Sequence, residues 1–387
     1  MRAAPKPLSI YLLEGTNSFA TAYYFNYLLF LLRDHHGFGD FQNLTLGAVH
    51  GLLFMGSAWL GGRIGQRLGY VMALRIGFSG MAASMALGWA FPGLIVQMLA
   101  FAGWTITMCF TWPNLEALAS AGQPSDKLAR RVGIYNVVWA GTAAFGYLMG
   151  GWMVAQLGTG SLYWFPLAIH ALQAAATFLW PARPTFETAP ASKAVMEHTI
   201  PLTRPAYFQK LAWVANPLSY MAINTLLVMV PGISTRLGLS TPETGTLMSL
   251  WYFTRTGAFA ILWLWGGWHY RFSWFAWGYG VLIGSFACLM VSSSIPLLIV
   301  AQCGFGWATA LLYFSSLYYS MDGSETHGVH GGIHEALVGI GIGGGPAISV
   351  AAAWLSGNPT APAWAVTSLL GLGGALLAHW RWRARAA

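Results

Sequence analysis

Apolar residues form long runs along almost the whole chain, and short polar or glycine-containing turns separate them. A membrane helix needs about 20 mainly apolar residues to cross a bilayer. Runs of that length predict twelve membrane helices, at residues 8–32, 43–61, 71–91, 94–118, 132–156, 162–180, 209–233, 243–265, 273–292, 296–320, 332–355 and 361–380. The first run is too long for the apolar part of a signal peptide, so we expect it to be retained as a helix.

One long polar connection divides these runs. Residues 181–208 carry both signs of charge and five prolines, which is typical of a linker rather than a helix. The sequence therefore predicts an all-α integral membrane protein with an N-terminal six-helix bundle at 1–180, a cytoplasmic linker at 181–208 and a C-terminal six-helix bundle at 209–387.

Short motifs recur in the same order in the two halves of the chain. Gly61-Gly62 recurs as Gly266-Gly267, Gly103-Trp104 as Gly306-Trp307, and Gly133-Ile134 as Gly332-Ile333. Such a repeat predicts two like half-bundles with a seam between them. Transporters built from repeats bind their substrate at that seam.

The composition supports a membrane protein. Of the 387 residues, 56% are hydrophobic and only 8% are charged, whereas soluble proteins have about 25% charged residues. The three cysteines, Cys109, Cys288 and Cys303, lie in apolar runs and are expected to be free thiols. The formal charge of +8 is spread along the chain without a basic cluster, so we expect no nucleic-acid partner.

The distribution of lysine and arginine predicts the orientation. With the N-terminus inside, sixteen of the nineteen basic residues fall on the cytoplasmic side; Arg33 and Arg236 fall outside, and Arg255 lies within a span. The positive-inside rule then places both termini in the cytoplasm. We expect a multi-pass protein of the inner or plasma membrane.

Two groups of six spans, parallel half-repeats and a cytoplasmic middle linker resemble the major facilitator superfamily over essentially the whole chain. The loop at residues 62–70, Gly-Arg-Ile-Gly-Gln-Arg-Leu-Gly-Tyr, is similar to the loop signature of that superfamily, with Gln66 where the family usually has aspartate. The resemblance implies a central cavity lined by spans one, four, seven and ten. It also implies gate contacts at the loop arginines, which here are Arg63, Arg67 and Arg271.

Glycines are concentrated in spans five and eleven, at Gly141 to Gly151 and at Gly339, Gly341, Gly343, Gly344 and Gly345. Small residues let membrane helices approach closely. Two interpretations stay open: these glycines serve packing alone, or the two spans also bend or slide there during opening.

Polar and aromatic residues recur at helical spacing on the four spans that the resemblance assigns to the cavity. Hydrogen bonding between helices is the alternative role for each of them. The candidate substrate-binding residues are Asn17, Thr21, Tyr24, Trp104, Thr107, Thr111, Tyr220, Asn224, Tyr252, Arg255, Tyr313 and Ser316.

Arg255 and Glu14 are the charged candidates inside the membrane. Arg255 falls near the middle of its span, where a charge costs roughly 2.5–3.5 kcal/mol, so it needs an acidic partner, a wet cavity or an anionic ligand. Glu14 is expected at a depth in the membrane similar to that of Arg255, so the two side chains could contact each other directly or through water. Glu14 is the candidate proton-coupling residue; pairing with a neighbouring helix is its alternative role.

Three residues near cytoplasmic helix ends are further candidates for gate contacts. Glu116 and Glu335 lie near the cytoplasmic ends of spans four and eleven. Asn136 occupies in the first half of the chain the position that Glu335 occupies in the second half. Simple solvation of the helix ends is the alternative.

His327, His330 and His334 lie between two spans at spacings that would hold a metal on a continuous helix. Gly328 and Gly331 favour a solvated loop instead, so we expect no metal and no cofactor. The sequence also has no phosphate-binding P-loop, which argues against ATP as the energy source.

The sequence thus predicts a secondary active transporter rather than an enzyme. It would move a small polar or amphipathic organic solute by alternating access, driven by an ion or proton gradient, with the lipid bilayer as surroundings and no obligate protein partner. A metal-dependent membrane enzyme and a transporter-like sensor or scaffold are the alternatives.

A wettable central cavity makes a direct prediction. Single cysteines at Asn17, Thr107, Tyr220 and Tyr313, in a chain lacking the native cysteines, should react with a water-soluble thiol reagent from at least one side of the membrane. Protection of all four positions from both sides would contradict the cavity.

Overall fold

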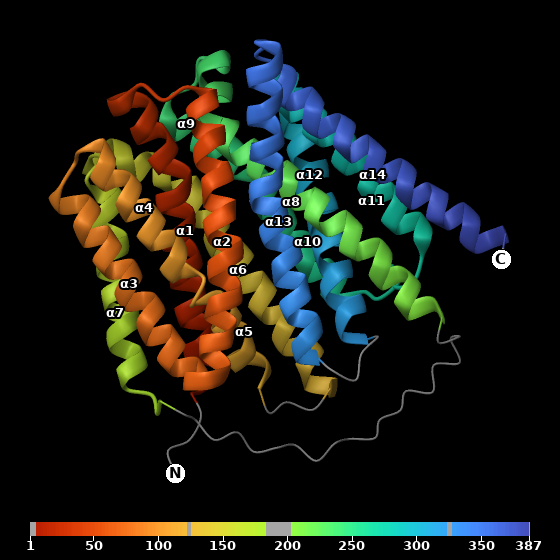
Figure 1. Cartoon of the computed structure of the whole chain (residues 1–387), viewed down its shortest axis with the longest axis horizontal. Coiled ribbons are helices and arrows are strands. Elements are labelled where there is room, and N and C mark those ends of the chain that lie inside the picture. Colours follow the sequence, from red (N-terminus) through yellow and green to blue (C-terminus); the bar gives the residue numbers. More distant parts are fainter. Residues whose placement is uncertain (1–4, 122–124, 183–202, 323–326, 387) are drawn as a thin grey trace. The chain divides into compact units, whose positions relative to one another are not determined.

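The computed structural model describes residues 5–121, 125–182, 203–322 and 327–386. These residues form helices and connecting turns without a strand (Figure 1). The helices are α1 (Pro7–His36), α2 (Asp40–Leu68), α3 (Tyr70–Ala90), α4 (Leu94–Met108), α5 (Trp112–Ser120), α6 (Ser125–Leu157), α7 (Ser161–Phe178), α8 (Thr203–Leu237), α9 (Thr241–Met248), α10 (Leu250–Leu264), α11 (Phe272–Val291), α12 (Ile295–Asp322), α13 (His327–Ser356) and α14 (Ala361–Ala386).

Every expected span falls on helix, but two of the spans are broken. The span expected at 94–118 divides into α4 and α5 at a turn formed by Cys109, Phe110 and Thr111. The span expected at 243–265 divides into α9 and α10 at Ser249. The first interruption lies inside a continuous apolar run, so hydropathy gives no sign of it.

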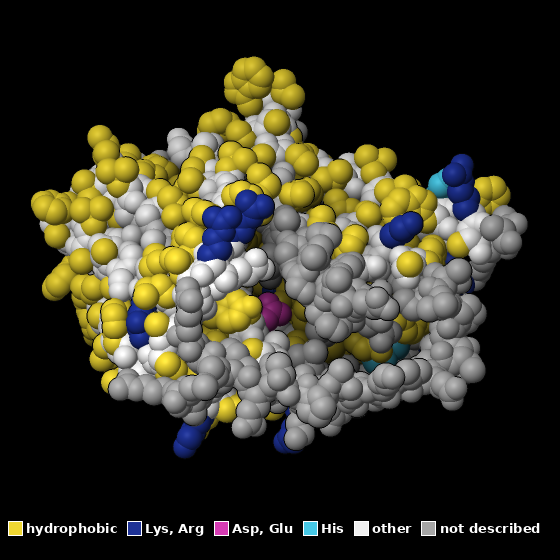
Figure 2. Space-filling model, turned by 60° about the horizontal axis from the view of Figure 1, so that its bottom comes forward, with side chains coloured by type: hydrophobic (Ala, Val, Ile, Leu, Met, Phe, Trp, Pro, Cys, Tyr) yellow, Lys and Arg dark blue, Asp and Glu magenta, His cyan; other side chains and the backbone are white. Residues whose placement is uncertain are grey.

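Nine helical segments of the described chain are long and apolar enough to cross a bilayer. Hydrophobic side chains cover much of the surface seen in Figure 2. Large apolar residues such as Ile95, Leu172 and Trp354 are more than 70% exposed, which suits contact with lipid rather than water. The protein is therefore a multi-pass membrane protein; the count of twelve spans and the arrangement of two repeats stay predictions.

The loop expected at residues 322–335 is wrong for residues 327–335, which are helical. α12 continues to Asp322 and α13 begins at His327, so Gly328 and Gly331 lie within helix. A glycine costs only about 1 kcal/mol in a helix, and extending an existing helix adds one hydrogen bond for each residue. The side chains of residues 321–336 lie outside the described part of the structure.

The described residues form two compact units. Unit 1 comprises the described residues within Met1–His36, Leu53–His198 and Thr241–Ser249, and unit 2 comprises those within Gly37–Leu52, Thr199–Ser240 and Leu250–Ala387. The first half of α2 thus belongs to unit 2 and its second half to unit 1, whereas α9 belongs to unit 1. The expected bundles at 1–180 and 209–387 stay a prediction.

In unit 1, α6 approaches its neighbours at glycines. A Cβ atom at Gly146 would lie 2.6 Å from the carbonyl oxygen of Phe19 in α1. A Cβ atom at Gly151 would lie 2.6 Å from the carbonyl oxygen of Thr241, where α9 begins. No side chain fits at either position without moving a backbone, so α6 requires these glycines to pack against α1 and α9.

In unit 2, α13 uses glycine in the same way. A Cβ atom at Gly345 would lie 2.2 Å from the carbonyl oxygen of Met221 in α8, and one at Gly341 would lie 2.6 Å from that of Pro217. On another side of α13, a Cβ atom at Gly51 of α2 would lie 2.1 Å from the Cα atom of Gly343. The expected packing role of these glycines is confirmed.

Two arginines bind the carboxyl ends of neighbouring helices. Arg75 of α3 donates hydrogen bonds to the carbonyl oxygens of Thr177 and Trp180 at the end of α7. Arg236 of α8 donates to the carbonyl oxygen of Met290 at the end of α11, at 2.7 Å. Each cation satisfies carbonyl groups that the helix end leaves unbonded and interacts favourably with the helix dipole.

Substitution Gly345→Leu should destabilise the fold, because the added side chain would meet the backbone of α8. We expect the melting temperature of the detergent-purified protein to fall by several degrees. Gly284→Leu in α11 is the matched control, since nothing lies within 4 Å of a Cβ atom there. Equal effects of the two substitutions would contradict the packing role of Gly345.

Candidate functional site

In unit 1 the polar stripe of α1 is buried. Glu14, Asn17, Thr21 and Tyr24 recur at steps of three and four residues, which places them on one face of the helix. Their exposed fractions range from 0 to 9%. The face therefore points into the protein rather than toward lipid, as the sequence predicted.

Two contacts join this stripe to α4 and to the turn that follows it. The Asn17 Nδ2 atom donates a hydrogen bond to the Oγ1 atom of Thr111, at 3.2 Å. The Tyr24 ring lies edge-on to the Trp104 ring, with centroids 4.9 Å apart. Four of the predicted binding residues are thus brought together.

Several buried polar atoms of α1 have no hydrogen-bond partner in the described structure. They include the Asn17 Oδ1 and Thr21 Oγ1 atoms. A buried polar group without a partner costs about 1–3 kcal/mol. Such atoms bind water or a polar solute when one is present, so this face of α1 is suited to a polar ligand.

Thr107 and Gln97 serve helix packing. The Thr107 hydroxyl donates to the carbonyl oxygen of Gly103, at 2.7 Å. Its methyl carbon lies 2.3 Å from the place of a Cβ atom at Gly80, so Thr107 packs closely on α3. Gln97 donates to the carbonyl oxygen of Gly88, at 2.9 Å, and accepts from Tyr163 of α7.

Glu14 lies in a pocket of hydrogen-bond donors. The side chain is 1% exposed. The Ser18 hydroxyl donates to one carboxyl oxygen at 2.7 Å, and the Tyr135 hydroxyl of α6 donates to the other at 2.8 Å. Glu116 of α5 is near enough to interact with Glu14 electrostatically. The Trp112 side chain also hydrogen-bonds to Glu14, so three neutral donors and a second carboxyl group surround it.

Sequence analysis missed Ser18 and Tyr135. Ser18 is one helical turn beyond Glu14, so the spacing alone could have identified it. Tyr135 lies on a different helix, and nothing in the sequence connects it with Glu14.

The expected gate residues of unit 1 have ordinary local contacts. The Asn136 Oδ1 atom accepts from the Trp139 indole at 2.8 Å, and its Nδ2 atom has no partner in the described structure. The Arg63 guanidinium lies over the Trp59 ring at 3.8 Å. Arg67 is exposed, and Glu116 is partly exposed.

In unit 2, Arg271 is exposed and forms the N-cap of α11. The Glu335 side chain lies outside the described part of the structure. The gate functions of all these residues stay predictions.

Arg255 of α10 is buried among aromatic rings from three helices. It is 3% exposed. Its guanidinium carbon lies 5.7 Å from the Tyr220 ring of α8, 5.3 Å from the Phe259 ring and 5.5 Å from the Tyr313 ring of α12. The Nη2 atom donates to the Tyr220 hydroxyl at 3.4 Å. Rings within about 6 Å stabilise a cation through their π faces.

The rings around Arg255 also contact one another. The Tyr313 ring centroid is 5.6 Å from that of Phe259 and 6.2 Å from that of Tyr220. Tyr252, one turn before Arg255, lies against Trp251 at 3.9 Å. Phe259 and Trp251 were not predicted, because an apolar ring in a membrane helix gives no sequence signal of a site.

Polar residues of α8 and α12 flank this aromatic cluster. Asn224 donates to the carbonyl oxygen of Tyr220 at 2.9 Å, and Ser316 is fully buried. Asn216, one turn before Tyr220, is fully buried, and neither polar atom of its side chain has a partner in the described structure. Unit 2 thus combines a buried cation, aromatic faces and amide groups.

The carboxyl group of Glu14 belongs to unit 1 and Arg255 to unit 2. That the two meet stays a prediction. Among the described residues, no group of three or more histidine, cysteine, aspartate or glutamate side chains could hold a metal. The expected histidine candidates, His327, His330 and His334, have side chains outside that part. Cys109, Cys288 and Cys303 are free thiols, as predicted.

No protein-family model and no curated protein sequence matches the chain. Solved structures of transporters do match its fold. The human organic anion transporter MFSD10 has a TM-score of 0.68 and 15% identity, over 96% of this chain and 100% of that one. The nucleoside transporter NupG has a TM-score of 0.68 and 12% identity, over 97% and 98%.

A bacterial homologue of the human drug peptide transporters PepT1 and PepT2 has a TM-score of 0.68 and 14% identity, over 98% of this chain and 97% of that one. Structural similarity over whole chains establishes a shared fold, and identities of 12–15% establish nothing beyond the fold. The chain has the fold of major facilitator superfamily transporters, and its subfamily is not assigned.

Proposed function

We propose that the protein is a secondary active transporter that moves a small polar or amphipathic organic solute with an anionic group. The observation that carries this proposal is Arg255, a buried cation among aromatic rings in a transporter fold. Proteins that share the fold include transporters of organic anions, nucleosides and peptides by name.

The cost of burying Arg255 supports an anionic solute. A charge near the middle of a membrane helix costs roughly 2.5–3.5 kcal/mol, and intramembrane cations are usually functional. Aromatic faces stabilise a guanidinium through their π electrons. A carboxylate or a similar anion would add charge-assisted hydrogen bonds to Arg255, and these are about twice as strong as hydrogen bonds between neutral groups.

The aromatic surroundings support an organic rather than an inorganic anion. Rings of Tyr220, Phe259 and Tyr313 offer apolar faces within a few ångströms of the guanidinium. Binding sites for small organic molecules are mainly apolar, with a few polar groups that orient the ligand. An amphipathic solute would place its anion on Arg255 and its apolar part on these rings.

Each unit would contribute one set of binding residues. Unit 1 would supply two unsatisfied oxygens of α1, from Asn17 and Thr21, together with the neighbouring side chains of Tyr24, Trp104 and Thr111. Unit 2 would supply Tyr220, Asn224, Tyr252, Arg255, Tyr313 and Ser316. We leave Thr107 out, because it packs on α3.

Glu14 is the proposed proton-coupling residue. Its carboxyl oxygens accept from Ser18 and Tyr135, and Glu116 is a second carboxyl group nearby. Carboxyl groups take up and release protons readily, so a pair of them beside hydroxyl donors suits proton coupling. Alternating access would expose Glu14 to the two sides in turn, with gate contacts at Arg63, Arg67, Glu116, Asn136, Arg271 and Glu335.

Binding of an organic anion should depend on Arg255. In a thermal-shift screen, small aromatic carboxylates should stabilise the parent protein more than their neutral amides do. Arg255→Gln should weaken binding at least about tenfold, because hydrogen bonds to charged groups contribute about 1.5–3 kcal/mol. Arg130→Gln, an exposed arginine outside the site, is the control. Equal stabilisation by acid and amide would contradict the anionic solute.

Substitution Glu14→Gln should remove the dependence of uptake on a pH gradient in reconstituted vesicles. Counterflow of a substrate should continue, because exchange requires no net proton movement. Exposed Glu243, changed to glutamine, is the matched control. If uptake by Glu14→Gln depends on the pH gradient as uptake by the parent protein does, Glu14 is not the proton-coupling residue. If the parent protein shows no counterflow for any solute, the proposal of transport itself is contradicted.

A further inference from the structure

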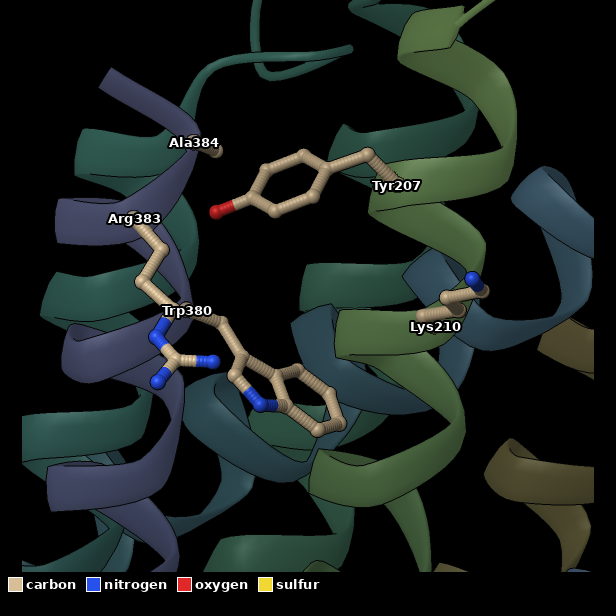
Figure 3. Close-up of a pocket in the computed structure, with 5 residues that line it drawn as sticks. All are labelled: Tyr207, Lys210, Trp380, Arg383 and Ala384. Atoms are coloured by element: carbon tan, nitrogen blue, oxygen red, sulfur yellow. The ribbon is translucent and has the colours of Figure 1, made fainter. Parts of the chain in front are cut away.

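A pocket lies between the first turns of α8 and the last turns of α14, both in unit 2. Its volume is about 440 Å³, and it is lined by Tyr207, Lys210, Trp380, Arg383 and Ala384 (Figure 3). None of these residues belongs to the proposed transport site. The lining combines two basic side chains with two amphipathic aromatic ones.

The two helices line the pocket from opposite sides, with Lys210 on α8 and Arg383 on α14. In Figure 3 the Tyr207 ring extends from α8 toward Arg383 and Ala384, and the Trp380 indole lies beside the Arg383 side chain. Lys210 and Arg383 are exposed, so both charges are accessible. The neighbouring Arg381 lies over the Phe272 ring at 5.2 Å and packs within the fold instead.

The pocket lies where membrane-spanning segments end. Ala206–Leu237 and Ala361–Ala384 are two of the segments that are long and apolar enough to cross a bilayer. The lining residues occupy the first turns of one segment and the last turns of the other. Tryptophan and tyrosine favour the membrane interface, so the pocket is at the level of lipid headgroups.

An exposed apolar stripe leads away from the pocket along α14. Leu372 and Leu376 precede Trp380 and Arg383 at steps of four, four and three residues, which places all four on one helix face. Leu372 is 70% exposed and Leu376 is 40% exposed. An acyl chain attached to a headgroup in the pocket would contact this stripe.

We infer that this pocket binds the headgroup of an anionic phospholipid, with a phosphate between Lys210 and Arg383. Basic pockets between membrane helices at the cytoplasmic surface bind such headgroups. The two cations complement the negative charge of the headgroup. The aromatic rings lie at the membrane depth of a headgroup, and the leucine stripe offers an apolar surface to the acyl chains of the lipid. A free phosphate ion would use only the first of these three features.

Lipid titration of the detergent-purified protein, followed by native mass spectrometry, tests this site. The probes are phosphatidylglycerol, phosphatidylcholine, glycerol phosphate and inorganic phosphate. We expect phosphatidylglycerol to bind most tightly. The double variant Lys210→Gln/Arg383→Gln should weaken its binding about ten- to thirty-fold, because each basic residue near an anionic surface contributes a factor of about five.

The double variant Arg130→Gln/Arg131→Gln is the matched control, since it removes the same charge from a region outside the pocket. Equal losses in both variants would show unspecific attraction of anionic lipid and overturn the site. Equal binding of phosphatidylcholine would overturn the role of charge. Binding of glycerol phosphate or inorganic phosphate as tight as that of the lipid would show a site for free anions.

The leucine stripe is tested separately with a photoactivatable phosphatidylglycerol. Cross-links should map to α8 near Tyr207 and to α14 between Leu372 and Arg383. Cross-links elsewhere, with none on these two helices, would overturn the proposed site even where the charge variants weaken binding.

Discussion

Close contact between helix backbones at glycine is the interaction on which the rest of this structure depends. Lipid provides no hydrophobic drive between helices, so tight packing must stabilise their association. Gly146 brings α6 against α1, and Gly341 and Gly345 bring α13 against α8. α1 and α8 carry the polar stripes of the two units. The glycines therefore determine where the proposed binding side chains lie.

Gly341 shows this dependence most directly. A Cβ atom there would lie 2.4 Å from the Cβ atom of Tyr220, whose ring and hydroxyl contact Arg255. The packing of α13 thus sets the position of one wall of the aromatic cluster. A change in the packing of α13 would therefore also move Tyr220 relative to Arg255.

The two units hold opposite kinds of buried charge. Unit 1 surrounds the carboxyl group of Glu14 with hydroxyl donors and a second carboxyl group, whereas unit 2 surrounds the guanidinium of Arg255 with aromatic faces. A carboxyl group among neutral donors is able to gain or lose a proton. A guanidinium keeps its charge, so it is suited to binding an anion. This difference underlies the division between proton coupling and solute binding that we propose.

The sequence by itself determined where helices form and which residues share a helix face. Long apolar runs and the 3.6-residue period are local properties, so the expected spans fall on helix and the α1 stripe is buried as predicted. Glu14 and Arg255 were evident because charges in apolar runs are rare.

Only the tertiary structure decided what each helix face contacts. It placed Thr107 against α3, brought Tyr135 to Glu14 and Phe259 to Arg255, broke two spans, and extended helix through Gly328. These outcomes depend on contacts between residues distant in the chain, and the periodicity of a single helix does not specify its neighbours.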